Sequence, residues 1–139
     1  MHDPYDLLRF VTAQEPAISG VLAELKAGRK RTHWIWFVFP QVYGLGSSGM
    51  AQRFAISSKA EAQAYLAHPV LGPRLRQCVE LVNGVEGRTA NGIFGYPDDL
   101  KFRSSMTLFA QSAQDNQVFL DALQKYYGGE MDPLTLAKL

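Results

Sequence analysis

The chain has 139 residues, of which 47% are hydrophobic and 19% charged, and its formal net charge is +1. This size and composition predict one globular domain over residues 1–139 with a substantial buried core. The near-neutral charge gives no general attraction to nucleic acids or acidic membranes, although a local basic patch is compatible with it. Cys78 is the single cysteine, which excludes an internal disulfide and a cysteine-based zinc cluster.

Membrane association is not indicated by the sequence. The N-terminal stretch MHDPYDLLRF lacks the basic and apolar regions of a signal peptide. The longest apolar run, Trp34 to Phe39, is far shorter than the roughly 20 residues that cross a bilayer. We therefore expect a cytoplasmic protein without a membrane anchor.

Two helices are predicted at the start of the chain. Asp3-Pro4 has the form of an N-cap followed by proline, which places the first helix over residues 4–14. The second helix covers residues 16–27, where Ile18, Val21, Leu22 and Leu25 form one apolar stripe. Gly28 follows as a C-terminal stop.

Four cations lie close together where the second helix ends: Lys26, Arg29, Lys30 and Arg31. Such residues are typical of a solvated helix end, because cations complement the helix dipole there. They would also form an anion-binding rim, in which Arg29 and Lys30 hold anionic groups and Trp34 stacks on a base or sugar. The cluster does not extend into a long basic stripe, which disfavours nucleic acid as the partner.

His33 is the candidate for proton transfer, because an imidazole can release and take up a proton near neutral pH. The alternative is a structural, hydrogen-bonding histidine, since no carboxylate or nucleophile is identified beside it. The three histidines are scattered without the spacing of a metal site. We expect neither a metal nor another cofactor.

The run WIWFVF has high strand propensity but no alternation of apolar and polar residues. As a strand it would be apolar on both faces and would need paired neighbours, of which Arg53 to Ser57 is a short one. A buried central helix of about two turns, stopped before Pro40, requires fewer assumptions.

Gly44, Gly46 and Gly49 have the G-x-G-x-x-G spacing of dinucleotide-binding turns. That fingerprint requires a preceding strand, a following helix and an acid about 20 residues further on. Glu61 is the nearest such acid, but it is better explained as the capping-box partner of Ser58. We interpret the glycines as a turn that lets the backbone pass close to a neighbour or ligand, with Gln41 nearby as a hydrogen-bonding candidate.

The rest of the chain also has helical patterns. Short helices are predicted over residues 59–67, 89–94 and 133–139, and longer ones over residues 71–82 and 119–127. The predicted fold is all-α: a compact, single-domain multihelical bundle with a short buried apolar central segment.

A helix that begins near Pro97 buries Phe102, Met106 and Phe109 and places Arg103, Ser104 and Thr107 on the opposite arc. The polar arc is either an ordinary helix face, with hydroxyls bonded to helix carbonyls, or a cluster of donors for an oxyanion. The chain contains no G-x-S-x-G elbow, so a serine hydrolase is unsupported.

Several segments are similar to the motifs of a bacterial family known as domain of unknown function 1810: RFVTAQ, AGRKRTHWIWFVFPQVYGLGSS, EAQAYLAHPVLGPRL, IFGYPDDLKFRSSMTLFA and DPLTLAKL. The resemblance spans nearly the whole chain and implies a compact multihelical fold. Some members of that family carry the label calpastatin, but that inhibitor is disordered and repetitive whereas this chain is neither. The resemblance implies no established activity.

Two functions follow from these observations. In the first, Arg29, Lys30, Trp34, Gln41, Arg103 and Ser104 form one pocket for a small anionic ligand of the nucleotide or ADP-ribose type, with His33 as the catalytic candidate. In the second, the chain is a non-enzymatic interaction module whose basic rim contacts an acidic protein partner.

Overall fold

The computed structural model describes residues 2–139, and within them it contains ten helices and no strand. The helices are α1 Leu8–Gln14, α2 Ile18–Lys26, α3 Ile35–Val38, α4 Gly49–Arg53, α5 Lys59–Ala67, α6 Leu71–Asn83, α7 Ala90–Phe94, α8 Asp98–Ser112, α9 Gln117–Tyr127 and α10 Pro133–Leu136. The prediction of an all-α fold is confirmed. Within the same residues no helix is both long and apolar enough to cross a membrane.

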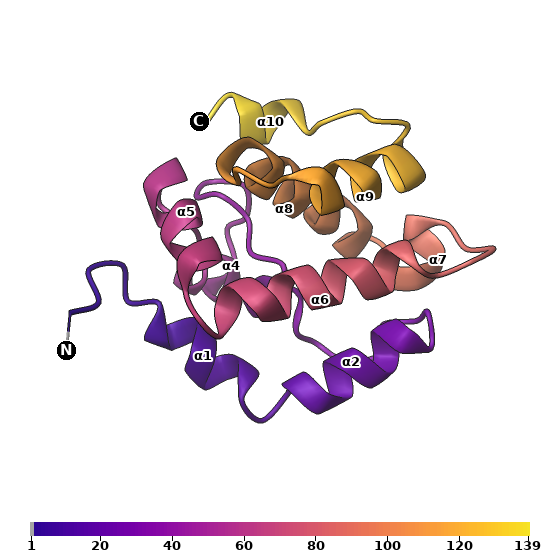
Figure 1. Ribbon diagram of the computed structural model, residues 1–139, viewed down its shortest axis with the longest axis horizontal. Coiled ribbons are helices and arrows are strands. Elements are labelled where there is room, and N and C mark those ends of the chain that lie inside the picture. The colour runs from indigo at the N-terminus through magenta and orange to yellow at the C-terminus, as the bar shows by residue number, and fades with distance from the viewer. Residues whose placement is uncertain (1) are drawn as a thin grey trace.

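Two long helices organise the molecule. Helix α6 runs across the middle, with α1 and α2 on one side of it and α8 and α9 on the other (Figure 1). Helix α8 packs against α3, α5, α7, α9 and α10. Every residue from Ser104 to Ala110 is buried, so α8 is enclosed on nearly all sides and the predicted polar arc is not a solvent-facing surface.

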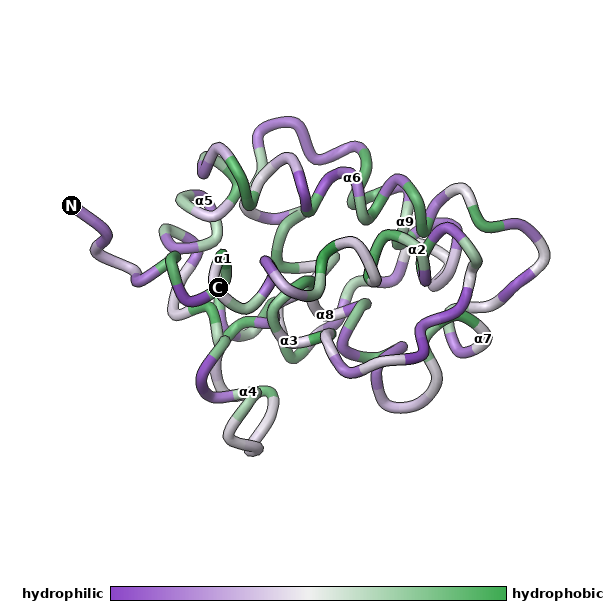
Figure 2. Tube along the Cα trace, turned by 90° about the horizontal axis from the view of Figure 1, so that it is seen from below, coloured by the Kyte–Doolittle hydropathy of each residue, from purple (hydrophilic) through white to green (hydrophobic). Residues whose placement is uncertain are grey.

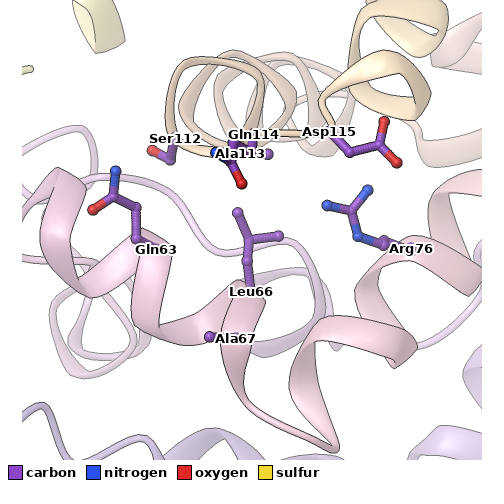
Figure 3. Close-up of a pocket in the computed structure, with 8 residues that line it drawn as sticks. All are labelled: Gln63, Leu66, Ala67, Arg76, Ser112, Ala113, Gln114 and Asp115. Carbon is purple, nitrogen blue, oxygen red and sulfur yellow. The ribbon is translucent and has the colours of Figure 1, made fainter.

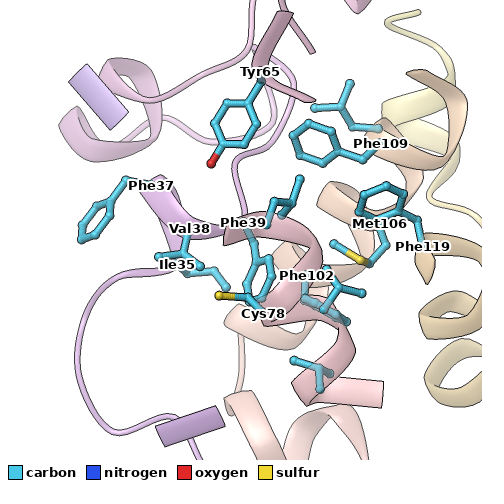
Figure 4. Close-up of a cluster of buried hydrophobic side chains, with 14 of the residues drawn as sticks. Ile35, Phe37, Val38, Phe39, Tyr65, Cys78, Phe102, Met106, Phe109 and Phe119 are labelled. Carbon is cyan, nitrogen blue, oxygen red and sulfur yellow. The ribbon is translucent and has the colours of Figure 1, made fainter. Parts of the chain in front are cut away.

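The core is rich in aromatic side chains. Phe102 of α8 stacks on Phe94 with 4.6 Å between ring centroids and meets Phe39 edge-on at 4.9 Å. Phe39 lies close to Cys78 and to Phe102 of α8, whereas Phe37 points away from them and packs on Phe54 (Figure 4). Burial raises the pKa of Cys78 to about 12, so this thiol stays neutral and serves as packing.

The central apolar segment is helical as predicted, but α3 is a single turn of four residues rather than two turns. Phe39 and Pro40 follow as buried, non-helical residues because proline cannot continue the helix. After them Val42 forms an isolated parallel bridge with Ile56. The pairing with residues 53–57 that a strand would have required is therefore present only as this one bridge.

The first helix begins later than predicted, at Leu8 rather than at residue 4. Asp6 has a φ of 51°, which no right-handed helix can include. The Asp3 carboxylate still caps this end, because it accepts the N–H groups of Leu7 and Leu8 at 2.9 and 3.0 Å.

The end of α2 forms as predicted. Gly28 has a φ of 77°, the left-handed conformation that glycine adopts without strain. Its N–H donates to the carbonyl of Leu25, and the N–H of Arg29 donates to that of Glu24, both at 3.0 Å. This pair of hydrogen bonds is a Schellman motif, which fixes the direction of the chain that follows.

The predicted capping box at α5 is only half formed. The hydroxyl of Ser58 accepts the N–H of Glu61 at 3.1 Å, as expected. The Glu61 carboxylate, however, accepts from the N–H and hydroxyl of Ser57 and from Arg9, because the half-buried guanidinium of Arg9 competes for it. The acid thus connects α1 to α5 instead of closing a local box.

Candidate functional site

A cleft of about 360 Å³ lies between the glycine turn, α8 and the C-terminal segment. Its lining comprises Gln41, Leu45, Gly46, Pro97, Leu100, Lys101, Arg103, Ser104, Asp132 and Leu134. Three of the predicted ligand-binding residues, Gln41, Arg103 and Ser104, therefore lie around one hollow. They come from a loop and a helix about sixty positions apart in the chain, and only the fold brings them together.

The hydroxyls of the α8 polar arc bond to helix carbonyls and also hold the C-terminal segment. Ser104 donates to the carbonyl of Leu100 at 3.1 Å and to the Asp132 carboxylate at 2.8 Å. The hydroxyl of Thr107 donates to the carbonyl of Arg103 and accepts the N–H of Asp132, both at 2.9 Å. The anion that this arc already binds is the protein's own carboxylate.

Asp132 carries a negative charge into the cleft. Burial tends to raise its pKa, but hydrogen bonds from Thr135, Ser104 and the Leu134 N–H outweigh burial and lower the pKa below its usual value. Asp132 is also the N-cap of α10, the role that its place before Pro133 would indicate. Its role in the cleft depends on how α10 docks on α8.

Two cations, Arg103 and Lys101, also line the cleft. Arg103 is held in place, because its Nε and Nη2 donate to the carbonyls of Glu130 and Met131 at 2.9 Å. Lys101 is held more loosely, since its ammonium lies 3.5 Å from Asp98 and 5.2 Å from the ring of Trp36. Lys101 is therefore the cation most able to turn toward a ligand. Its position three residues before Ser104 on the helix would have indicated that it shares this face.

The glycine turn supplies one wall of the cleft. Its chain and α4 stand out from the body of the molecule (Figure 2). Gly44 has a φ of 82°, and a Cβ at Gly46 would lie 2.7 Å from the side chain of Ala51. A helix does follow the glycines, but only the loop after α3 precedes them, so the strand of a dinucleotide fingerprint is missing.

The corner formed by residues 29–34 is organised by Glu24, which the sequence analysis did not single out. One carboxylate oxygen accepts the N–H of Arg31 at 2.6 Å and the indole N–H of Trp34 at 3.1 Å. The N–H and hydroxyl of Thr32 also donate to this carboxylate, at 3.0 and 2.6 Å. Glu24 thus binds the loop that leaves its own helix.

Trp34 cannot play the stacking role predicted for it. Its side chain is 2% exposed and packs on Phe39, with ring centroids 6.0 Å apart. An indole is mostly apolar, and Glu24 satisfies its single N–H, so burial is favourable. Both the indole N–H and the ring of Trp34 therefore make their contacts within the protein.

Lys30 is likewise unavailable to an external anion. Its ammonium lies 2.7 Å from the Asp98 carboxylate and 5.1 Å from the Trp34 ring, and its side chain is 6% exposed. The ion pair joins the corner to the first turn of α8. Arg29 and His33 are exposed, but neither lines the cleft. The single pocket expected from the sequence therefore divides into a cleft and a separate basic surface.

The Glu24 contacts predict a pH dependence of stability. Burial would raise the pKa of Glu24, but hydrogen bonds from Thr32, Arg31 and Trp34 lower it from 4.5 to about 2. The folded state therefore binds this proton less readily than the unfolded state, and the carboxylate stabilises the fold above about pH 4.5. This contribution is lost as the pH falls toward 2.

We expect Glu24→Gln to lower the free energy of unfolding by about 2 kcal/mol at neutral pH, the range for hydrogen bonds to a charged group. The variant's stability should also fall less steeply below about pH 4.5. Urea unfolding across this pH range measures both effects. Glu86→Gln is the control, because that side chain is 90% exposed and should change little. Equal acid profiles for wild type and Glu24→Gln would contradict the assignment.

A second hollow of about 530 Å³ lies between α5, α6 and the end of α8. Leu66 stands at its centre, and the guanidinium of Arg76 faces the side of the hollow that carries Asp115 (Figure 3). The guanidinium also lies 5.3 Å from the ring of Phe119. None of the predicted site residues lines this hollow. Within residues 2–139 no three histidine, cysteine, aspartate or glutamate side chains are grouped to hold a metal ion.

Comparison with known proteins gives a family and a structure. A family model described as "Protein of unknown function (DUF1810)" matches residues 4–139. The crystal structure of the conserved hypothetical protein Rv1873 from Mycobacterium tuberculosis has 60% sequence identity and a TM-score of 0.98, covering 99% of this chain and 98% of that one. No curated protein matches.

Proposed function

Because the chain belongs to the DUF1810 family of proteins of unknown function, we propose its function from its own geometry: it binds a small anionic ligand in the cleft between the glycine turn and α8. The observation that carries the proposal is the meeting of Gln41, Lys101 and Arg103 around one hollow. A volume of about 360 Å³ is within the usual range for small-molecule sites.

The charges of the cleft favour an anionic group at one end of the ligand. Lys101 shares the Asp98 carboxylate with Lys30, which lies closer to it, at 2.7 Å against 3.5 Å. Gln41 can donate or accept a hydrogen bond. Asp132 repels an anion, but hydrogen bonds from Ser104 of α8 and Thr135 of α10 already engage its carboxylate. The anionic group is therefore placed against Lys101 and Arg103.

The apolar part of the lining favours an uncharged body on the same ligand. Leu100 and Leu134 are 49% and 66% exposed, and Leu45 and Pro97 lie beside them. Covering such side chains contributes about 25 cal/mol for each Å² removed from water. A nucleotide or ADP-ribose type of ligand would place its base or sugar here, in place of the stacking on Trp34 expected from the sequence.

We predict that a member of a panel of nucleotides and phosphorylated metabolites raises the melting temperature of the protein. Lys101→Ala should reduce the affinity about tenfold, the equivalent of about 1.4 kcal/mol. The matched control is Lys59→Ala, which removes the same group from an exposed position outside the cleft. Absence of any stabilisation across the panel, or an equal loss in both variants, would contradict the proposal.

A further inference from the structure

The corner formed by residues 29–34 contributes to an exposed basic surface that is separate from the cleft. The chain leaving α2 is strongly hydrophilic (Figure 2). Lys26, Arg29 and Arg31 lie along this stretch, and all three are exposed. Arg88, from the loop before α7, joins them, because a Cβ placed on Gly28 would lie 3.5 Å from its Cδ and Nε. Two segments about sixty residues apart in the sequence thus contribute cations to the same part of the surface.

None of these four cations forms an ion pair with a carboxylate within residues 2–139. Of the fourteen lysines and arginines in the chain, six are paired with carboxylates: Arg9, Lys30, Arg74, Lys101, Arg103 and Lys125. Three more lie over aromatic rings, namely Arg53, Arg76 and Lys138. The nearby acids are occupied, since Glu24 holds the loop, Asp98 holds Lys30 and Glu86 lies 3.7 Å from Lys125. In the part of the chain that the structure describes, five cations have neither kind of partner: four lie at this corner, and the fifth is Lys59 at the start of α5.

The corner is rigid, which lowers the entropy cost of binding. The Schellman motif fixes Arg29, and the Glu24 carboxylate fixes the backbone of Arg31. The N–H of Lys30 donates to the carbonyl of Ile93 at 2.8 Å, which joins the corner to the end of α7. A partner would meet cations whose backbones are already in place.

An exposed aromatic side chain lies on the segment joined to this corner. Tyr96 is 77% exposed and lies between Ile93 and Asp98, the two residues that bond to Lys30. Tyrosine and arginine are the residue types that dominate the energetics of protein interfaces. A surface that combines them is suited to a protein partner, and its charge requires that partner to be acidic.

We propose that Lys26, Arg29, Arg31, Arg88 and Tyr96 form a docking surface for an acidic polypeptide segment that carries apolar side chains. The acidic residues of the segment face the guanidinium and ammonium groups, and an apolar residue covers Tyr96. A nucleic acid is the competing occupant, but four cations in a compact patch do not give the extended basic stripe along which a phosphate backbone binds. None of these five residues lines the cleft.

Binding of a fluorescein-labelled peptide of interspersed glutamates and leucines tests the proposal, measured by anisotropy at low and high salt. We expect salt-sensitive binding, weakened about tenfold by Arg29→Glu and by Arg88→Glu because like charges then face each other. Tyr96→Ala should weaken it several-fold at every salt concentration, since its contribution is apolar.

Lys59→Glu is the matched control, because it reverses a charge at another exposed position, the first residue of α5. It should leave peptide binding unchanged. The proposal is overturned if the peptide does not bind, if the control weakens binding as much as Arg29→Glu, or if a single-stranded oligonucleotide of the same charge binds more tightly than the peptide. Lys101→Ala should not affect peptide binding, which separates this surface from the cleft.

Discussion

Replacing Gly72 with alanine is expected to lower the free energy of unfolding by about 3 kcal/mol, at the upper end for overpacking of a core. Gly72 lies in the first turn of α6, where a Cβ would be 2.1 Å from the backbone oxygen of Leu66 in α5. A backbone carbonyl cannot move aside as a side-chain tip can, so the two helices would have to separate. Urea unfolding of the purified variant measures the loss.

The control for this prediction is Gly20→Ala, because Gly20, like Gly72, lies in the first turn of its helix, here α2. No heavy atom lies within 4 Å of a Cβ at Gly20. Alanine should there raise the free energy of unfolding by about 0.5 to 1 kcal/mol, the usual difference between glycine and alanine in a helix. The same substitution is thus expected to have opposite signs at two helical glycines. If Gly72→Ala were as stable as wild type, the close contact between α5 and α6 would not be a fixed feature of the fold.

Replacing Glu61 with alanine is expected to cost about 3 to 5 kcal/mol, the range found when one partner of a buried ion pair is removed. The Glu61 side chain is 3% exposed and lies 2.9 Å from Nη2 of Arg9. Its other oxygen accepts the N–H and hydroxyl of Ser57 at 2.9 and 2.7 Å. Removal therefore leaves a charge and two donors without their acceptor. Chemical unfolding should show the loss as a lower midpoint with an unchanged slope.

A double-mutant cycle with Arg9→Ala distinguishes the ion pair from simple loss of packing. Arg9 also donates to the carbonyls of Arg53 and Ala55, both at 2.9 Å, so its own replacement is costly. If the pair acts as a unit, the double variant loses less than the sum of the two single losses. Glu80→Ala on the exposed face of α6 should be nearly neutral. Additive losses in the cycle would show that Arg9 and Glu61 act separately.

The sequence predicted those parts of the fold that depend on local periodicity. The stripe containing Val21 and Leu25 and the arc containing Phe102 and Phe109 are buried as expected. Helix spacing is a property of neighbouring residues, so it can be read without knowing what the helix packs against. The length of α3 could not be predicted in this way, because WIWFVF is apolar on every side and so has no helical stripe. The helix ends at Val38, where the packing of Phe39 and Pro40 determines its length.

The candidate site was predicted only in part because its formation depends on contacts between distant segments. Gln41, Arg103 and Ser104 do surround one cleft. Trp34 and Lys30 instead bind other residues of the protein, Glu24 and Asp98. One local signal for that difference was present. Glu24 lies in the last turn of α2, where the helix dipole disfavours an anion, which marks it as an unusual residue; the structure shows that donors from the following loop stabilise it.

The docking of residues 130–135 on α8 affects when the cleft can form during synthesis. Arg103, Ser104 and Thr107 emerge from the ribosome well before Asp132, with which Ser104 and Thr107 form hydrogen bonds. Until Asp132 and Leu134 are in place, one wall of the cleft is missing and the α8 hydroxyls face solvent. The cleft therefore cannot form in a chain that stops before residue 134. A ligand that binds it would stabilise only chains that contain this segment.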